Sequence, residues 1–161
     1  MPEAQMLDGC SMWKPSRRSV VRLGLLLVAA QALTAPPSIA GDKAPLGIGG
    51  YDPVAYFTDG KPTRGLPDIA YEWDEHSYRF SRAEHRELFK ADPVRYAPQF
   101  ANYCAMALSR GEVHEANPEH WLISDGKLYI FTGPKGPDRF RRDLTENIDN
   151  ATRNRALIQK H

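Results

Sequence analysis

Alternation of large apolar and polar residues predicts two β-hairpins. In the first, residues 69–74 and 77–81 alternate around Glu75-His76, which places Tyr71 with Trp73 on one face and Tyr78 with Phe80 on one face. In the second, residues 120–124 and 127–133 flank Asp125-Gly126, a strong two-residue turn signal.

Helical patterns lie between and after the hairpins. Residues 82–91 predict a helix, with Ser81 as N-cap and Glu84 completing a capping box. Residues 93–100 predict a short helical turn, 103–108 a helix turn or a buried strand, and Asn117-Pro118 the start of a further short helix. We expect Trp73, Phe89 and Tyr96 in the core.

The mixture of hairpins and short helices has no βαβ rhythm. It predicts an α+β fold, a small single domain of short β-hairpins and short helices. No internal repeat is visible in the sequence.

Residues 1–40 have the pattern of a signal peptide. A basic segment, 16–22, precedes the uncharged apolar run 23–33, and Ser38-Ile39-Ala40 ends in a small-x-small cleavage site. The apolar run is too short to span a bilayer as a helix. Arg17 and Arg18 favour a twin-arginine signal, the alternative being a general secretion signal. The sequence therefore predicts a periplasmic protein.

Cleavage after Ala40 leaves one domain with a near-neutral charge. Removing residues 1–40 reduces 21 basic and 20 acidic residues to 17 and 18. Such a balance argues against nucleic acid or an anionic membrane as partner. Cys10 is also removed, so Cys104 remains as a single thiol that is buried, a ligand or reactive.

Four segments in order resemble the YHS domain family, in its secreted, single-domain bacterial branch. They are GYDPVAYF (50–57), YRFSRAEHRELFKADPVRYAPQF (78–100), NYCA (102–105) and DGKLYIF (125–131). The resemblance implies a YHS domain over 49–132, after an extended lead-in over 41–48 and before a C-terminal helical extension over 133–161. It also implies a link to heavy-metal handling, especially copper.

The chain departs from the metal-handling branch of that family. Ala55, Ser81 and His85 occupy the positions of its three cysteines, and of these only His85 is a good ligand for a soft metal. The secreted branch typically has a glycine pair before YCA, where this chain has Ala101-Asn102. The family's metal function is therefore not transferred directly.

The candidate metal ligands are Cys104, His85 and Met106. Cysteine, methionine and histidine form the ligand set that copper prefers, although an apolar setting also suits a buried structural cysteine and a core methionine. If the YCA segment packs against the 82–91 helix, His85 can approach the thiol. His114 and His120 lack helical ligand spacing and are expected at the surface.

No catalytic motif is recognisable, so the sequence does not predict an enzyme or a catalytic residue. We expect an exported, periplasmic YHS-domain protein that binds a transition metal, copper first, in metal handling or tolerance. The alternatives are a single-cysteine thiol-redox protein and a metal-free module that docks a periplasmic protein partner through Tyr51, Tyr56 and Trp73.

Overall fold

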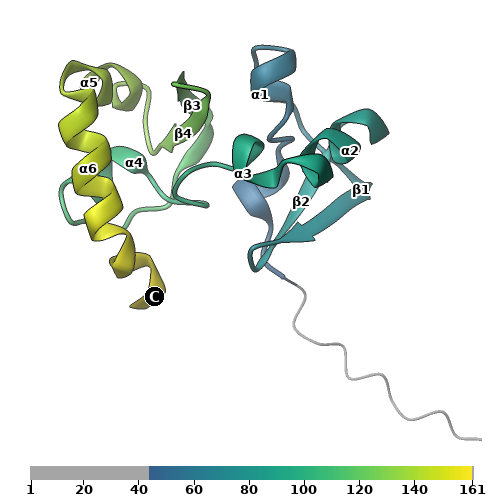
Figure 1. Ribbon diagram of the computed structural model, residues 1–161, viewed down its shortest axis with the longest axis horizontal. Helices are drawn as coiled ribbons and strands as arrows, with labels where there is room; N and C mark the ends of the chain where they lie inside the picture. Colours follow the sequence, from purple (N-terminus) through teal and green to yellow (C-terminus); the bar gives the residue numbers. More distant parts are fainter. Residues whose placement is uncertain (1–43, 161) are drawn as a thin grey trace, which may run out of the picture. The chain divides into compact units, whose positions relative to one another are not determined.

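The computed structural model describes residues 44–160, which form an α+β domain (Figure 1). Its elements in chain order are η1 (Gly47–Gly50), α1 (Ala55–Thr58), β1 (Leu66–Trp73), β2 (His76–Phe80), α2 (Ala83–Ala91), α3 (Pro93–Tyr96), α4 (Ala105–Ser109), β3 (Asn117–Ser124), β4 (Lys127–Phe131), α5 (Gly136–Arg142), α6 (Leu144–Asn154) and η2 (Arg155–Lys160). The predicted fold class is confirmed. The predicted signal peptide lies outside the described residues. Within 44–160, no helix combines the length and apolar character that crossing a membrane requires.

Both predicted hairpins are confirmed. Strand β1 pairs antiparallel with β2, and β3 pairs antiparallel with β4, in two separate sheets. The first turn is made by Asp74 and Glu75 and the second by Asp125 and Gly126, and all four residues have positive φ angles. Turns of this conformation match the right-handed twist of the strands that they join.

The two hairpins repeat one another in register. Leu66 pairs with Phe80 in the first, and Asn117 pairs with Phe131 in the second, so each number rises by 51 (117 − 66 and 131 − 80). Every other paired position of the two hairpins has the same offset, including the irregularity near the start of β1 and of β3. The repeat that sequence inspection did not find is therefore present in the backbone pairing.

The repeat extends to the segments before the hairpins. Isolated bridges join Tyr51 to Arg64 in the first half and Tyr103 to Glu115 in the second. The residue after each bridge closes the loop in the same way: the Asp52 N–H donates to the Thr63 carbonyl (2.8 Å), and the Cys104 N–H donates to the His114 carbonyl (2.9 Å). Each half thus contains a bridge, a short helix (α1 or α4), a hairpin and a following helix (α2 or α5).

Each half also has the same aromatic triad on its second strand and following helix. The members, all at most 2% exposed, are Tyr78, Phe80 and Phe89 in the first half and Tyr129, Phe131 and Phe140 in the second. The helical phenylalanine lies 5.3 Å from the strand phenylalanine, between ring centroids, in both halves. These matched contacts explain why α2 and α5 occupy equivalent places beside their hairpins.

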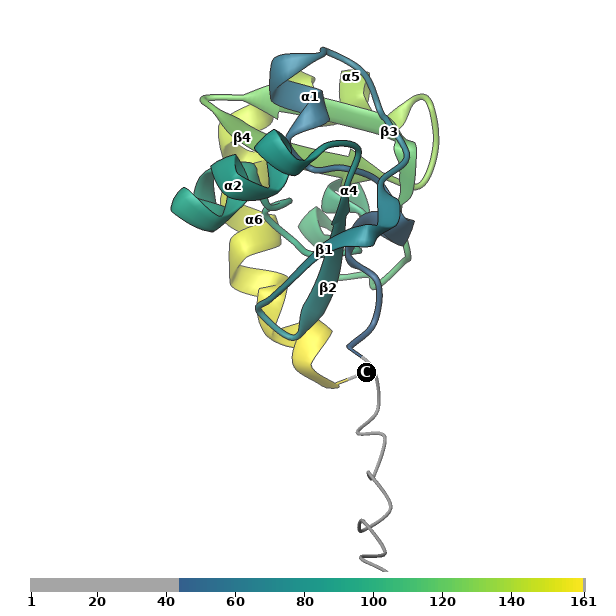
Figure 2. The same cartoon turned by 90° about the vertical axis from the view of Figure 1, so that its right-hand side faces the viewer.

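Strand β4 contributes to two hydrophobic clusters. Because side chains alternate along a strand, Leu128 and Ile130 pack in the cluster around Phe89, while Tyr129 and Phe131 pack in the cluster around Phe140. The two views in Figures 1 and 2 show α2 next to β1 and β2, and α6 next to α4, in agreement with the packing of these elements. Burial of β4 on both faces therefore connects the two halves.

The predicted core is confirmed at Phe89 and Tyr96, which are 0% and 8% exposed, and Trp73 packs against the same cluster while partly buried. Ile48 also belongs to this cluster. It adopts a left-handed conformation (φ 42°), which is unusual for a β-branched residue. The end of the segment expected as an extended lead-in is thus part of the core.

Two local predictions are wrong. Ser81 does not cap α2, because its N–H and its hydroxyl both donate to the carboxylate of Asp52, and α2 begins at Ala83 without a side-chain cap. Asn117 and Pro118 start the strand β3 rather than a helix, because the pairing with β4 extends to Asn117.

Candidate functional site

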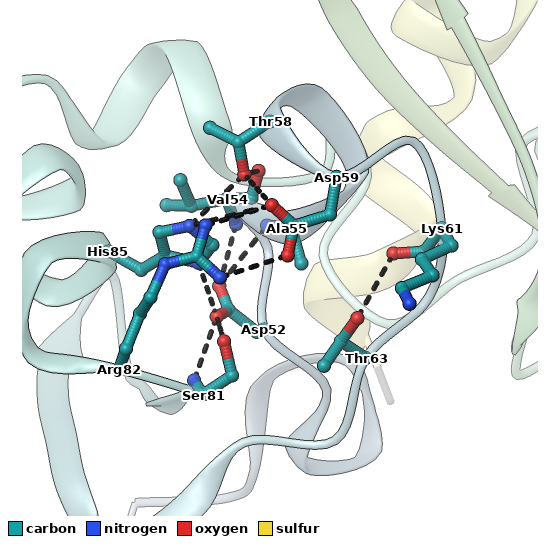
Figure 3. Close-up of polar contacts among 10 residues, drawn as sticks. All are labelled: Asp52, Val54, Ala55, Thr58, Asp59, Lys61, Thr63, Ser81, Arg82 and His85. Carbon is teal, nitrogen blue, oxygen red and sulfur yellow. Dashed lines mark hydrogen bonds and ion pairs between the residues drawn. The ribbon is translucent and has the colours of Figure 1, made fainter.

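The carboxylate of Asp52 lies at the centre of a buried polar network (Figure 3). Its Oδ1 accepts from the backbone N–H groups of Val54 (2.9 Å) and Ala55 (3.3 Å), which lie at the start of α1. Its Oδ2 accepts from the Ser81 N–H (2.8 Å) and hydroxyl (2.7 Å) and from the ring of His85 (2.6 Å). One side chain therefore ties the first short helix to the end of β2 and to α2.

The ring of His85 is bonded at both nitrogens and is 1% exposed. Nδ1 donates to Asp52, and Nε2 lies 3.1 Å from the Thr58 hydroxyl oxygen. Because the Thr58 hydroxyl has one proton, it can donate to Nε2 or to Asp59 but not to both at once. Sequence inspection did not identify Asp52 as the partner of His85.

An exposed ion pair covers this network. The guanidinium of Arg82 donates to both carboxylate oxygens of Asp59, at 3.0 Å and 2.8 Å. The hydrogen bonds from Arg82, and next that from Thr58, lower the pKa of the Asp59 carboxyl below its usual range. Asp59 therefore stays ionised well into the acidic range.

The order carboxylate, imidazole and hydroxyl is shared with nucleophilic triads, but the surroundings of these residues favour a structural role. Asp52 is fully occupied by protein donors, and His85 has no free ring nitrogen. The Thr58 hydroxyl is itself within reach of the Val54 carbonyl (3.2 Å) and of Asp59 (2.9 Å). We interpret the network as a cross-link of the fold.

A cavity of about 400 Å³ lies beside α4, the short helix of the second half. Cys104, the residue before α4, and Met106, in its first turn, both line this cavity. Cys104 is 5% exposed and its thiol is not in a disulfide. The lining also includes residues 132–136 and Arg139 of α5.

The structure brings two of the three predicted ligands to one place. Cys104 and Met106 share the cavity, whereas His85 is bonded to Asp52 and Thr58. Helix α2, which carries His85, packs on β1, β2 and α3, while α4 packs on α6, α5 and β4. A Cys104–His85 pair would need the YCA segment to pack against the 82–91 helix. That packing is not among these contacts.

The repeat relates the two sites. Cys104 occupies in the second half the position that Asp52 occupies in the first, directly after the bridge. By the offset of 51, the counterpart of His85 is Gly136 (85 + 51), which also lines the cavity. The place of a closed carboxylate–imidazole pair is therefore taken by a thiol and a residue without a side chain.

The other two histidines considered, His114 and His120, are not among the residues that line the cavity. The exposed His114 lies with its Nε2 3.2 Å from Glu112, and His120 is in β3. Across residues 44–160, no group of three or more His, Cys, Asp or Glu side chains is arranged to hold a metal ion. Of the three aromatic residues expected as a docking surface, Tyr51 and Tyr56 are 8% and 1% exposed, and Trp73 is partly buried.

Comparisons of the chain with protein-family models, with curated proteins and with solved structures found no significant match.

Proposed function

We propose that this chain is an exported module that binds a soft transition metal ion, Cu(I) first, through Cys104 and Met106. The observation that carries the proposal is that these two sulfur side chains line one cavity. Thiolate and thioether sulfur are the protein donors that Cu(I) prefers. His85 is left out of the ligand set because both of its ring nitrogens have partners.

Two sulfur donors make an open rather than a closed site. A third donor from a small molecule or from another protein completes the coordination, which suits a protein that receives and passes on a metal ion. The proposal of a YHS-type domain, which rests on the four sequence segments, agrees with this role. The proposal of a periplasmic location rests on residues 1–40.

A Cu(I) titration of the full chain tests the proposal. A Cys10→Ser background leaves Cys104 as the single thiol, and a chromophoric Cu(I) chelator serves as competitor. We expect one Cu(I) per chain, release of a proton on binding, and protection of the thiol from alkylation. Cys104→Ser should abolish binding, and Met106→Leu should weaken it while preserving apolar volume.

The His114→Ala/His120→Ala double variant is the control, because it removes two potential ligands that are not among the residues lining the cavity. It should bind Cu(I) as the parent does. Failure of the parent to compete with the chelator, or loss of binding in the histidine double variant alone, would contradict a site centred on Cys104.

A further inference from the structure

We propose that the cavity beside Cys104 binds a small organic anion: an acidic head group, such as a carboxylate, sulfonate or phosphate, on a short apolar body. This binding does not require a metal ion. It uses the same cavity as the proposed Cu(I) site, and the two proposals are tested separately.

The charged lining of the cavity is predominantly cationic. Arg110, Lys135 and Arg139 line it, and within residues 44–160 none of the three forms an ion pair with a carboxylate. The one acidic lining residue, Glu112, lies 3.2 Å from His114. Three cations against one carboxylate leave the lining with a net positive charge, which attracts an anion from solution.

These cations reach the cavity from two different elements. Arg110 directly follows α4, whereas Lys135 directly precedes α5 and Arg139 lies within it. Their convergence therefore depends on the packing of α4 on α5. An acidic group between them is contacted from more than one side.

Part of the cavity lining is apolar. Cys104, Met106 and Ala107 contribute from α4 and the residue before it, and Pro134 contributes from the loop after β4. Apolar surface with a few convergent polar groups is typical of small-molecule sites, and about 400 Å³ lies in the lower part of their size range. The occupant is thus a small molecule with a hydrocarbon portion.

The first half shows what the second half lacks. There, the protein supplies its own carboxylate, Asp52, which is saturated by hydrogen bonds that include one from His85. In the second half the equivalent position is Cys104, which carries no carboxylate, and Glu112 is the one acidic residue of the cavity lining. The structure assigns that place to an acidic group from outside.

Octanoate is a suitable probe because it combines one carboxylate with a short alkyl chain. We suggest a titration of the metal-free full chain, Cys10→Ser, followed by amide chemical shifts. Saturable shifts are expected in α4 and in residues 132–136, and raising the salt concentration should weaken binding. Octan-1-amine, with the same chain and the opposite charge, should not compete.

Substitutions separate the site from general electrostatics. Arg110→Gln and Arg139→Gln should each weaken octanoate binding about tenfold, the effect of losing one charge-assisted hydrogen bond. Arg142→Gln removes the same charge from α5 outside the cavity lining and should leave binding unchanged. Cys104→Ser should retain octanoate binding, which separates this inference from the Cu(I) proposal.

Three results would overturn the inference: absence of saturable shifts with octanoate, equal binding of octan-1-amine, or equal weakening by Arg142→Gln and Arg139→Gln. Loss of Cu(I) binding with octanoate binding intact would contradict the proposed function alone.

Discussion

Asp52 and His85 are 33 positions apart in sequence, yet the carboxylate and the imidazole form a 2.6 Å hydrogen bond with almost no solvent exposure. In Asp52→Asn, an NH₂ group replaces one of the two carboxylate oxygens. This group cannot accept hydrogen bonds, whereas both oxygens of Asp52 do. Because at least one buried donor then loses its partner, we expect the free energy of unfolding to fall by about 3 kcal/mol. Urea unfolding measures this change. Asp59→Asn, which breaks the exposed pair with Arg82, is the control and should have a much smaller effect.

The repeat predicts equal roles for two phenylalanines. Phe89 and Phe140 are both 0% exposed and pack on equivalent strand residues, so each substitution by alanine should cost about 3–5 kcal/mol in unfolding free energy. Val94→Ala, at a site that is 69% exposed, should cost less than about 0.5 kcal/mol. A large difference between the two phenylalanine variants would argue against equivalent packing.

Two buried tyrosines predict a loss of stability in alkali. Burial is the main cause that raises the pKa of Tyr56 and Tyr78 above the usual tyrosine value of about 10. Above about pH 10 the unfolded chain releases phenol protons that the folded chain retains, so the unfolding free energy falls as pH rises. Each tyrosine contributes a slope of up to about 1.4 kcal/mol per pH unit.

Urea unfolding of the parent and of Tyr78→Phe at pH 9 and pH 11 measures this loss. The variant should show the shallower decline, since phenylalanine has no proton to release. An unfolding free energy that does not change between the two pH values would rule out the expected ionisation behaviour.

Ala101 is held in a left-handed conformation (φ 50°), which favours glycine over residues with a side chain. Ala101→Gly removes the clash of the side chain with its own backbone, and should raise the unfolding free energy by about 0.5–1 kcal/mol. The reverse change at Gly60 provides a control, because φ is 64° there and an added Cβ meets no atom within 4 Å. Gly60→Ala should therefore destabilise the protein through conformation alone. Equal thermal midpoints for parent and Ala101→Gly would contradict the expectation.

The export proposal predicts that cleavage leaves Gly41 as the first residue and that export depends on Arg17 and Arg18. Replacing both by lysine keeps the charge but removes the pair that a twin-arginine translocase recognises. Full-length precursor should then accumulate in the cytoplasm, as cell fractionation and N-terminal sequencing can show. Unchanged export of the lysine variant would instead indicate the general secretion route.

Local patterns predicted the hairpins and α2 because alternation and turn residues act over a few positions. Asp125-Gly126 identifies its turn directly, and the aromatic face of β2 follows from period-two alternation. Asn117 shows the limit of such rules: an Asx-Pro pair suits a helix start, but pairing with β4 makes it part of a strand.

The candidate sites depend on contacts between distant segments, which periodicity does not report. Neither the Asp52–His85 bond nor the cations around Cys104 can be read from spacing along the chain. One signal for the repeat was available. In each half a tyrosine is followed two residues later by a phenylalanine, and nine residues after that by a second phenylalanine. These are Tyr78, Phe80 and Phe89 in the first half and Tyr129, Phe131 and Phe140 in the second. The rest of the two halves differs too much for inspection to align them.

The structural repeat separates two requirements, ligand binding and stability of the fold, which compete when the same residues have to meet both. Ligand binding needs open space and polar groups without internal partners, and both features reduce the stability of a fold. In this chain the half around Asp52 satisfies its own polar groups, while the half around Cys104 leaves space and charge available. Under the binding proposals above, changes in the exposed lining residues Arg110, Lys135 and Arg139 can alter ligand preference without touching the Asp52 network or the buried Phe140. The half-domain is the unit within which this protein can acquire a new specificity.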